Sequence, residues 1–318
     1  MSEGRKYFET LNLVGSFTLA FSIPWIIFRV LRTIYIKRHY NKLCGKVVVI
    51  TGASSGLGEA LAHEFYKRGC RVVLCARRRQ ELERVRNDLL HTHSLIPTHP
   101  PIIIPLDLYD IKSLGSHVNK IISITGQVDI LINNGGISQR STVLMTDIEV
   151  DNKIMMVNYM GSVALTKAIL PFMITRKDGH IVFISSVQGL VALPERSAYS
   201  ASKHALQAFA DSLRAEMSIY NVAVTVVSPG YIKTKLSLNA LTGSGNSYGQ
   251  MDPTTESGYS PEFVAQKIVE AVVENKKEII ISTWLPKIAI FLRKYIPFLY
   301  FLVVAHRAKK SLKQSNCK

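Results

Sequence analysis

A short apolar run followed at once by glycines constrains this chain more than any other feature. Residues 47–50 are all Val or Ile, a composition typical of a strand that is buried on both faces of a parallel sheet. The loop 52–58 holds three glycines, and a helical pattern runs from Glu59 to Arg68. Glycine lets a backbone approach a pyrophosphate closely, and the free N–H groups of a helix start attract its charge. We therefore predict a dinucleotide-binding unit here, although glycines also occur in turns without a ligand.

The rest of the chain continues the alternation of strand and helix. Further strands are predicted at 71–76, 102–108, 128–137, 180–186, 222–227 and 278–282. This order predicts an α/β fold, a doubly wound (Rossmann) parallel sheet formed by residues 44–285. A chain of 318 residues fits one such domain with two tails, 1–43 and 286–318.

Three arginines, Arg77, Arg78 and Arg79, follow the second predicted strand. A cofactor with a free ribose 2′-hydroxyl usually meets Asp or Glu at this point, whereas a 2′-phosphate needs cations. The segment has arginines and no acid, which favours NADP(H). The alternative is a solvated helix start that is rich in arginine.

Other strands also end in polar or glycine residues. Asp107 ends the third strand, where it could meet an adenine amino group or could equally be a helix cap or turn former. Residues 133–136 and 228–230 follow later strands in the same way. Ligands of such sheets bind beyond the carboxyl ends of the strands, so these residues are expected to form the floor of a cofactor site.

Tyr199 and Lys203 lie four positions apart in a segment with a helical pattern. On a helix this spacing places the phenol and the ammonium on one face. A neighbouring cation favours the phenolate, so we expect a lowered pKa and a tyrosine that exchanges protons near neutrality. Taken alone, the same spacing fits an amphipathic helix with a surface lysine.

Several motifs in a fixed order resemble the short-chain dehydrogenase/reductase family. They are the glycine loop at 51–58, Asn133-Asn134-Gly135, Ser186 thirteen residues before Tyr199, Lys203, and Pro229-Gly230. The resemblance covers residues 44–285 and implies an NAD(P)-dependent oxidoreductase of the doubly wound fold. It also implies a homodimer, and no metal site is expected.

The resemblance implies roles for individual residues. Tyr199 would exchange the proton with a carbonyl oxygen, Lys203 would lower the phenol's pKa and anchor the ribose, and Ser186 would bind the substrate's carbonyl oxygen. Asn158 would hold a water that continues the proton relay. The cofactor-binding residues implied are Gly52, Ser54, Ser55, Gly56, Leu57, Gly58, Arg77, Arg78, Asp107, Leu108, Asn134, Gly135, Tyr199, Lys203, Pro229, Gly230, Ile232 and Thr234.

One position departs from the family pattern. Gly136 stands where the family usually has alanine after Asn-Asn. The change removes a methyl group and adds backbone freedom, so we expect a looser cofactor floor with no functional group lost.

Four more stretches, at 197–204, 214–217, 228–232 and 248–252, are similar to a membrane-bound branch of the family. That branch has been linked to reduction of acyl- and alkyl-dihydroxyacetone phosphate, which implies a lipid-like ketone substrate. A steroid or retinoid dehydrogenase is the alternative enzyme. A cofactor-binding sensor or scaffold without turnover is a third possibility, against which the complete set Asn158, Ser186, Tyr199 and Lys203 argues.

The positive charge of the chain is concentrated in its tails. The formal net charge is +16, of which residues 1–50 carry +6 and residues 284–318 carry +8. Both tails also hold the longest apolar runs, and basic charge beside apolar runs suggests a membrane surface with anionic lipid. Zinc-finger spacings and basic recognition helices are absent from the sequence, so we expect no nucleic-acid partner.

The N-terminal tail has a run without charges from Thr10 to Phe28. Its 19 residues would span about 28 Å as a helix, close to the thickness of a bilayer core. We expect a membrane anchor, with a cleaved signal peptide or an interfacial helix as alternatives. The basic cluster at 29–42 predicts a catalytic domain on the cytosolic side. We expect the membrane to be that of the endoplasmic reticulum or the peroxisome.

Two segments after residue 230 are expected to serve the substrate. Residues 232–260 include the Gly- and Ser-rich stretch 242–249 and lie where the family places a substrate lid, although a plain surface loop has the same composition. The apolar run 295–305 is too short to cross a bilayer. We expect it to lie in the membrane interface, with a core-packing or dimer-forming helix as the alternative.

Overall fold

The computed structural model describes residues 22–315 in two compact units, Met1–Lys42 and Leu43–Lys318. In the first unit residues 22–40 are helical, and apolar side chains such as Trp25 and Phe28 are exposed. Residues 10–21 of the predicted anchor lie outside the described residues. The described remainder of that run, 22–28, is helical.

The second unit is built on a seven-stranded sheet in the order β3-β2-β1-β4-β5-β6-β7. Every pairing is parallel. The strands are β1 Val47–Thr51, β2 Arg71–Ala76, β3 Ile102–Pro105, β4 Ile130–Asn133, β5 Gly179–Ile184, β6 Val222–Pro229 and β7 Glu278–Ile281. The predicted doubly wound parallel sheet is confirmed.

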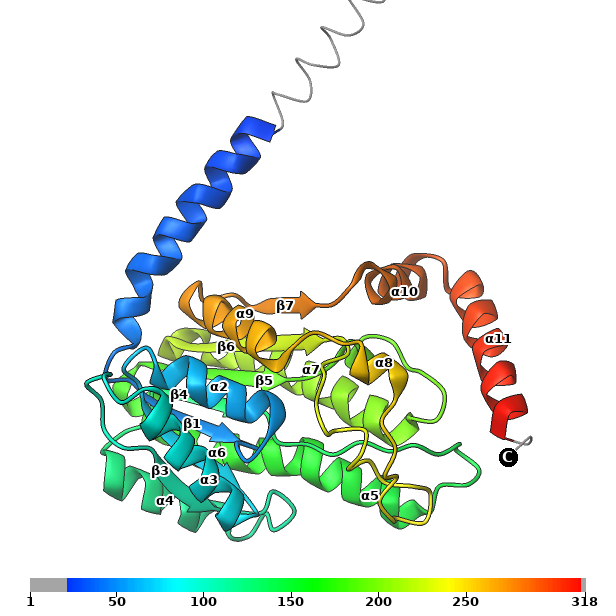
Figure 1. Ribbon diagram of the computed structural model, residues 1–318, viewed down its shortest axis with the longest axis horizontal. Coiled ribbons are helices and arrows are strands. Elements are labelled where there is room, and N and C mark those ends of the chain that lie inside the picture. Colours follow the sequence, from blue (N-terminus) through cyan, green and yellow to red (C-terminus); the bar gives the residue numbers. More distant parts are fainter. Residues whose placement is uncertain (1–21, 316–318) are drawn as a thin grey trace, which may run out of the picture. The chain divides into compact units, whose positions relative to one another are not determined.

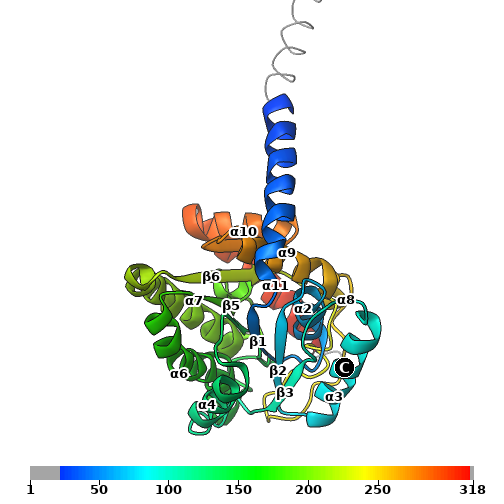
Figure 2. The same ribbon diagram turned by 90° about the vertical axis from the view of Figure 1, so that its left-hand side faces the viewer.

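Helices cover both faces of the sheet (Figures 1 and 2). One face carries α2 (Gly56–Tyr66), α3 (Arg79–Thr92) and α9 (Pro261–Val273). The other carries α4 (Leu114–Thr125), α6 (Gly161–Arg176) and α7 (Ser197–Met217). The remaining helices are η1 Asn41–Leu43, α5 Ile148–Met155, a π-helical turn Met156–Met160, η3 Val187–Gly189, η4 Ser218–Tyr220, α8 Pro253–Glu256, α10 Trp284–Tyr295 and α11 Pro297–Ser315.

The core follows from strands that are apolar on both faces. Val48, Val49 and Ile50 of β1 have no exposed surface, because β1 lies between two other strands and under both helical layers. Phe183 of β5 meets Phe209 of α7 edge to face, with ring centroids 5.8 Å apart. Such two-sided burial is what a run of β-branched residues predicts.

Four predicted strands are shorter than the sequence suggests, β3 and β4 by more than β5 and β7. β3 ends at Pro105 and β4 at Asn133, before the polar residues that follow each strand. Beyond these points the backbone leaves the ladder of the sheet, so residues 106–108 and 134–137 are loops. The loops lie past the carboxyl ends of the strands, where a ligand can reach them.

Within the described part of the chain, one helical stretch, Ile148–Arg176, is long and apolar enough to cross a membrane. It runs through α5, the π-helical turn and α6. Leu165, Ile169 and Met173 on this stretch are fully buried in the main core. Its apolar composition is therefore accounted for by packing against the sheet.

The chain ends in two helices beyond β7, at the side of the domain toward which the strands point (Figure 1). Both expose large apolar side chains, including Trp284, Phe291 and Phe298. Tyr300 of α11 is an exception, because it is 4% exposed and its hydroxyl donates to the main-chain oxygen of Ala192, 2.6 Å away. This hydrogen bond ties the C-terminal segment to the loop before α7.

The acid stability of the domain is expected to depend on His180. Its Nε2 lies 2.7 Å from the Thr225 hydroxyl, and burial lowers its pKa to about 4. An unfolded histidine titrates near ~6.5, so the stabilising contribution is complete above that pH and is lost as the pH falls toward 4. The free energy of unfolding should fall by at most ~3 kcal/mol over this pH range. The actual decrease should be smaller, because solvent still reaches part of the His180 side chain.

Urea unfolding between pH 4 and pH 7 measures this contribution. His180→Gln should flatten the dependence of the unfolding free energy on pH, whereas His99→Gln, a change at an exposed histidine, should leave it as it is. An unchanged slope in His180→Gln would show that other groups control acid unfolding.

Candidate active site

A cavity of about 590 Å³ lies at the carboxyl ends of the strands. It is lined by the glycine loop after β1, by residues after β2, β3, β4 and β5, by α7 and by the segment after β6. All eighteen cofactor-binding residues predicted from the sequence, and Ser186, contribute to its wall. Asn158 does not line the cavity.

The glycine loop approaches its neighbours so closely that side chains would not fit. Gly52 has φ +66°, and a Cβ there would lie 2.9 Å from Cα of Gly135. A Cβ on Gly58 would lie 2.2 Å from the Gly52 carbonyl oxygen. The loop therefore packs against the end of β4 and against the start of α2, and it lines the cavity at the N-terminal end of that helix.

A cation pair lies beyond β2. Arg77 and Arg78 both line the cavity, and Nη2 of Arg78 donates to the Ser54 hydroxyl over 3.3 Å. Arg79 is bonded instead to Glu83 on α3, 2.9 Å away, and does not line the cavity. Two of the three arginines that the sequence singled out are thus placed to meet an anionic group.

Asp107 forms a turn at the cavity, and its contact with an adenine amino group stays a prediction. Its Oδ1 accepts the N–H of Tyr109 over 3.0 Å, which is a turn-forming hydrogen bond, and the residue also lines the cavity with Leu108.

Tyr199, Lys203 and Ser186 meet at one end of the cavity. Tyr199 and Lys203 lie one turn apart on α7 and are 8% and 4% exposed. Nζ of Lys203 lies 5.7 Å from the centre of the Tyr199 ring and donates to the main-chain oxygen of Ile184 over 2.8 Å. The Ser186 hydroxyl donates to the main-chain oxygen of Pro229 over 3.5 Å, accepts the N–H of Gln188 over 3.1 Å, and favours the anion of the neighbouring Tyr199 phenol.

Burial dominates the titration of both groups on α7. It raises the pKa of Tyr199, while the Ser186 hydrogen bond and the charges of Arg140 and Arg196 act in the opposite direction. It lowers the pKa of Lys203 to about 8. The sequence-based prediction that the Tyr199 pKa is lowered was therefore wrong for the protein without a bound cofactor. The buried phenol loses its hydration, which raises its pKa, and the Lys203 ammonium donates to the Ile184 carbonyl and not to the phenol.

Asn158 lies behind the cavity wall, in the π-helical turn between α5 and α6. Its Oδ1 accepts the N–H of Ile137 over 2.8 Å, and its Nδ2 donates to the Ile137 carbonyl and to the Ser202 hydroxyl. π-helical turns occur often at functional sites. This side chain fixes the loop after β4 against α7.

Gly136 lies close to the side-chain amide of Asn158. An added Cβ would lie 3.1 Å from Oδ1 of Asn158 and 3.6 Å from Nζ of Lys203. The glycine therefore packs tightly and does not leave the floor loose, contrary to the expectation from sequence. Alanine at this position would require the amide to shift by a few tenths of an ångström.

Sequence reasoning missed a charged cluster beside Tyr199. Arg140, which lines the cavity, donates through Nε to Oδ2 of Asp252 over 2.8 Å, and Nη2 of Arg196 donates to the same oxygen over 3.1 Å. The three residues come from separate loops, and no local pattern in the sequence joins them.

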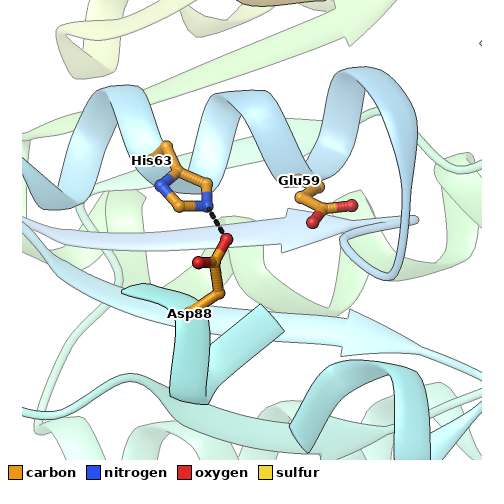
Figure 3. Close-up of side chains that lie close together, drawn as sticks. All are labelled: Glu59, His63 and Asp88. Carbon is orange, nitrogen blue, oxygen red and sulfur yellow. Dashed lines mark ion pairs between the residues drawn. The ribbon is translucent and has the colours of Figure 1, made fainter. Parts of the chain in front are cut away.

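A second group of polar side chains lies on α2 and α3 (Figure 3). Ligand atoms of Glu59, His63 and Asp88 lie within 4.8 Å of one another, and His63 pairs with Asp88 over 3.2 Å. Both carboxylate oxygens of Glu59 accept hydrogen bonds from Arg84, at 2.8 and 3.0 Å. These contacts join the two helices, and we assign no metal to them.

Comparison with known proteins defines the class. The sequence profile of the family described as short chain dehydrogenase matches residues 46–243. The chain therefore belongs to the short-chain dehydrogenase/reductase family, and it is a nicotinamide-dependent oxidoreductase of the CH–OH type.

The relatives narrow this class. The chain is 55% identical over 298 residues to a dehydrogenase/reductase SDR family protein 7-like of Anopheles gambiae, with 94% of each chain covered. It is 52% identical over 268 residues to dehydrogenase/reductase SDR family member 7B of Xenopus tropicalis, covering 84% of this chain and 87% of that one. It thus resembles the member 7B group.

Solved structures support the fold. A short-chain dehydrogenase/reductase from Burkholderia phymatum, in complex with NAD, superimposes with a TM-score of 0.68 at 23% identity. The match covers 79% of this chain and 92% of that one.

Proposed function

We propose that the protein is an NADP(H)-dependent, membrane-associated reductase that interconverts a ketone and a secondary alcohol on a lipid-like substrate such as acyl- or alkyl-dihydroxyacetone phosphate. One observation carries the chemistry: the Ser186 hydroxyl, the Tyr199 phenol and the Lys203 ammonium line the same cavity as the glycine loop. The residues that would hold a dinucleotide fit it, because close glycine packing leaves main-chain N–H groups at the cavity end of α2.

When bound, the nicotinamide supplies or accepts the hydride at the carbonyl carbon. Tyr199 donates the proton to the carbonyl oxygen in reduction and takes it back in oxidation. Ser186, which favours the phenolate of Tyr199, stabilises the charge that develops on the carbonyl oxygen. Lys203 places positive charge near the Tyr199 ring. Asn158 lies behind the cavity wall, next to Gly136, and would hold the water that continues the proton relay.

Cofactor choice is proposed to depend on Arg77 and Arg78. Both guanidinium groups line the cavity beyond β2, where the family fold carries the adenosine ribose. Cations at this point favour a ribose 2′-phosphate over a free hydroxyl.

Membrane association is proposed to involve both ends of the chain. The described part of the N-terminal run is an exposed apolar helix. Residues 284–318 carry eight Lys or Arg and no acid, and α10 and α11 expose large apolar side chains. This combination fits an anionic lipid surface, and Tyr300 ties it to the loop before α7. We also propose a homodimer, following the family resemblance. The positive-inside rule supports a catalytic domain that faces the cytosol, and we propose the endoplasmic reticulum or peroxisome membrane as its location.

Removing the phenolic hydroxyl tests the chemistry. With acyl-dihydroxyacetone phosphate and NADPH offered to detergent-purified protein, Tyr199→Phe should lower kcat by ~10²–10⁴-fold, because the proton donor is lost. NADPH binding, followed by its fluorescence, should remain. Tyr220→Phe, at a tyrosine outside the cavity, serves as the control. Full activity of Tyr199→Phe would exclude the proposed role.

Cofactor preference gives a separate test. Arg77→Gln and Arg78→Gln should each raise the KM for NADPH by about 10- to 100-fold, since a charge-assisted hydrogen bond contributes ~1.5–3 kcal/mol, and should leave the KM for NADH nearly unchanged. Arg79→Gln, outside the cavity, is the matched control. Equal effects on both cofactors would contradict 2′-phosphate recognition.

Fluorescence can locate the C-terminal helices at a membrane. The chain has two tryptophans, so Trp25→Phe leaves Trp284 as the single reporter. In vesicles that contain anionic and brominated lipids, its emission should be quenched, because its 67% exposed side chain would enter the interface. A tryptophan placed at Leu95 in a background with both native tryptophans replaced should stay unquenched. Equal emission from both reporters would argue against this surface.

A further inference from the structure

The charged cluster at the Tyr199 end of the cavity has more positive than negative charge. Arg140 and Arg196 share the carboxylate of Asp252, and among the described residues one oxygen of that carboxylate receives all their ion-pair contacts. The three side chains are 8–11% exposed. A buried excess charge loses its hydration, so an arrangement of this kind is stabilised when an anion joins it.

Two further polar atoms in this region have unmet hydrogen-bonding capacity. Nε of Arg196 and the Tyr231 hydroxyl are buried and have no hydrogen-bond partner among the residues that the structure describes. Tyr231 lines the cavity with Arg140. Buried donors are nearly always paired in folded proteins, so these atoms call for a partner that the chain does not supply.

The position of the cluster relates it to the reacting groups. Arg140 follows Gln139, whose Oε1 accepts the N–H groups of Ala198 and Tyr199 over 3.0 and 3.3 Å. Arg196 immediately precedes α7. Both charges act on the Tyr199 phenol. The cluster is therefore fixed at the Tyr199 end of the cavity, away from Arg77 and Arg78 beyond β2.

From this geometry we propose that Arg140 and Tyr231, which line the cavity, form an anion subsite that binds the phosphate monoester of the substrate while its ketone lies at Tyr199, and that Arg196 adds positive charge behind them. The inference rests on the proposed ketone reductase function and specifies its substrate class. The phosphate takes the place of a second carboxylate: it offsets the excess positive charge and accepts a hydrogen bond from the unpaired Tyr231 hydroxyl. An uncharged ketone, such as a steroid or retinal, has no group for this subsite.

Asp252 gives the subsite a second property. It lies in the segment after β6, at the start of α8, and its N–H donates to Ser237. The same ion pairs that leave one positive charge for the ligand thus attach the 232–260 segment to the loops that carry Arg140 and Arg196.

Paired substrates test the proposal. The purified full chain is given acyl-dihydroxyacetone phosphate or the same lipid without its phosphate, acyl-dihydroxyacetone, and inorganic phosphate is tested as an inhibitor. Arg140→Gln leaves Asp252 paired with Arg196, so the variant should fold, and melting temperature and NADPH binding check this. Loss of the Arg140 charge acts on the Tyr199 phenol with either ketone, so the two substrates are compared with each other. We expect kcat/KM for the phosphorylated ketone to fall about 10- to 100-fold more than kcat/KM for the uncharged ketone.

The matched variants are Arg140→Lys, which keeps the charge and should recover part of the loss, and Arg79→Gln, which should have no effect. Equal losses on both ketones in Arg140→Gln would overturn the subsite and leave the reductase function intact. Inhibition of the wild-type chain alone by inorganic phosphate would support recognition of the phosphate group itself.

A binding measurement separates this inference from the reductase function. Calorimetry follows 1-acyl-glycerol 3-phosphate, the alcohol that corresponds to the phosphorylated ketone, as it binds to the NADP⁺-loaded chain. If neither ketone is turned over, the proposed function fails, whereas binding that is lost in Arg140→Gln still supports the subsite. Binding that is equal in the wild type and the variant would overturn it.

Discussion

The placement of the active site depends on one hydroxyl group at the end of β1. Oγ1 of Thr51, which is fully buried, accepts the N–H groups of Asn134 and Gly135, each over 2.9 Å, and donates to the carbonyl of Ile132. Between β1 and β4 the order of the sheet reverses, and the chain segments that leave the two strands diverge. The hydroxyl satisfies main-chain groups that no strand pairs at this point, and so fixes the floor of the cavity against the glycine loop.

Burial then determines the charges at the reacting end. Desolvation disfavours the phenolate of Tyr199 and also disfavours the ammonium of Lys203, whose pKa falls to about 8. At neutral pH the phenol keeps its proton and the ammonium is still mostly charged. The site therefore holds the proton that carbonyl reduction needs, and Arg140 and Arg196 make its departure less costly.

The sequence predicted the fold well wherever the pattern was local. The apolar runs at 47–51 and 71–76 became strands with the expected bounds, because two-sided burial leaves a continuous signal. The family resemblance, which rests partly on the glycine loop and the Tyr199–Lys203 spacing, also implied which residues would line one cavity. The π-helical turn at Asn158 could not be predicted, since it is one extra residue per turn within a continuous helical pattern.

Features that depend on residues far apart in the sequence could not be predicted. Arg140 and Asp252 are 112 positions apart, and nothing near either residue indicates its partner. The direction of the Tyr199 pKa shift was missed for the same reason: spacing on a helix reveals a neighbouring charge, but burial depends on every element packed around it.

The hydrogen bond between Tyr300 and Ala192 bears on how the protein matures during synthesis. It joins residues 108 positions apart, and the later one lies in the last helix of the chain. During synthesis the N-terminal elements emerge first, whereas the loop before α7 gains this contact only after α11 has emerged. The loop that leads into the helix carrying Tyr199 and Lys203 is therefore completed last, when the C-terminal segment is free to fold back onto the domain.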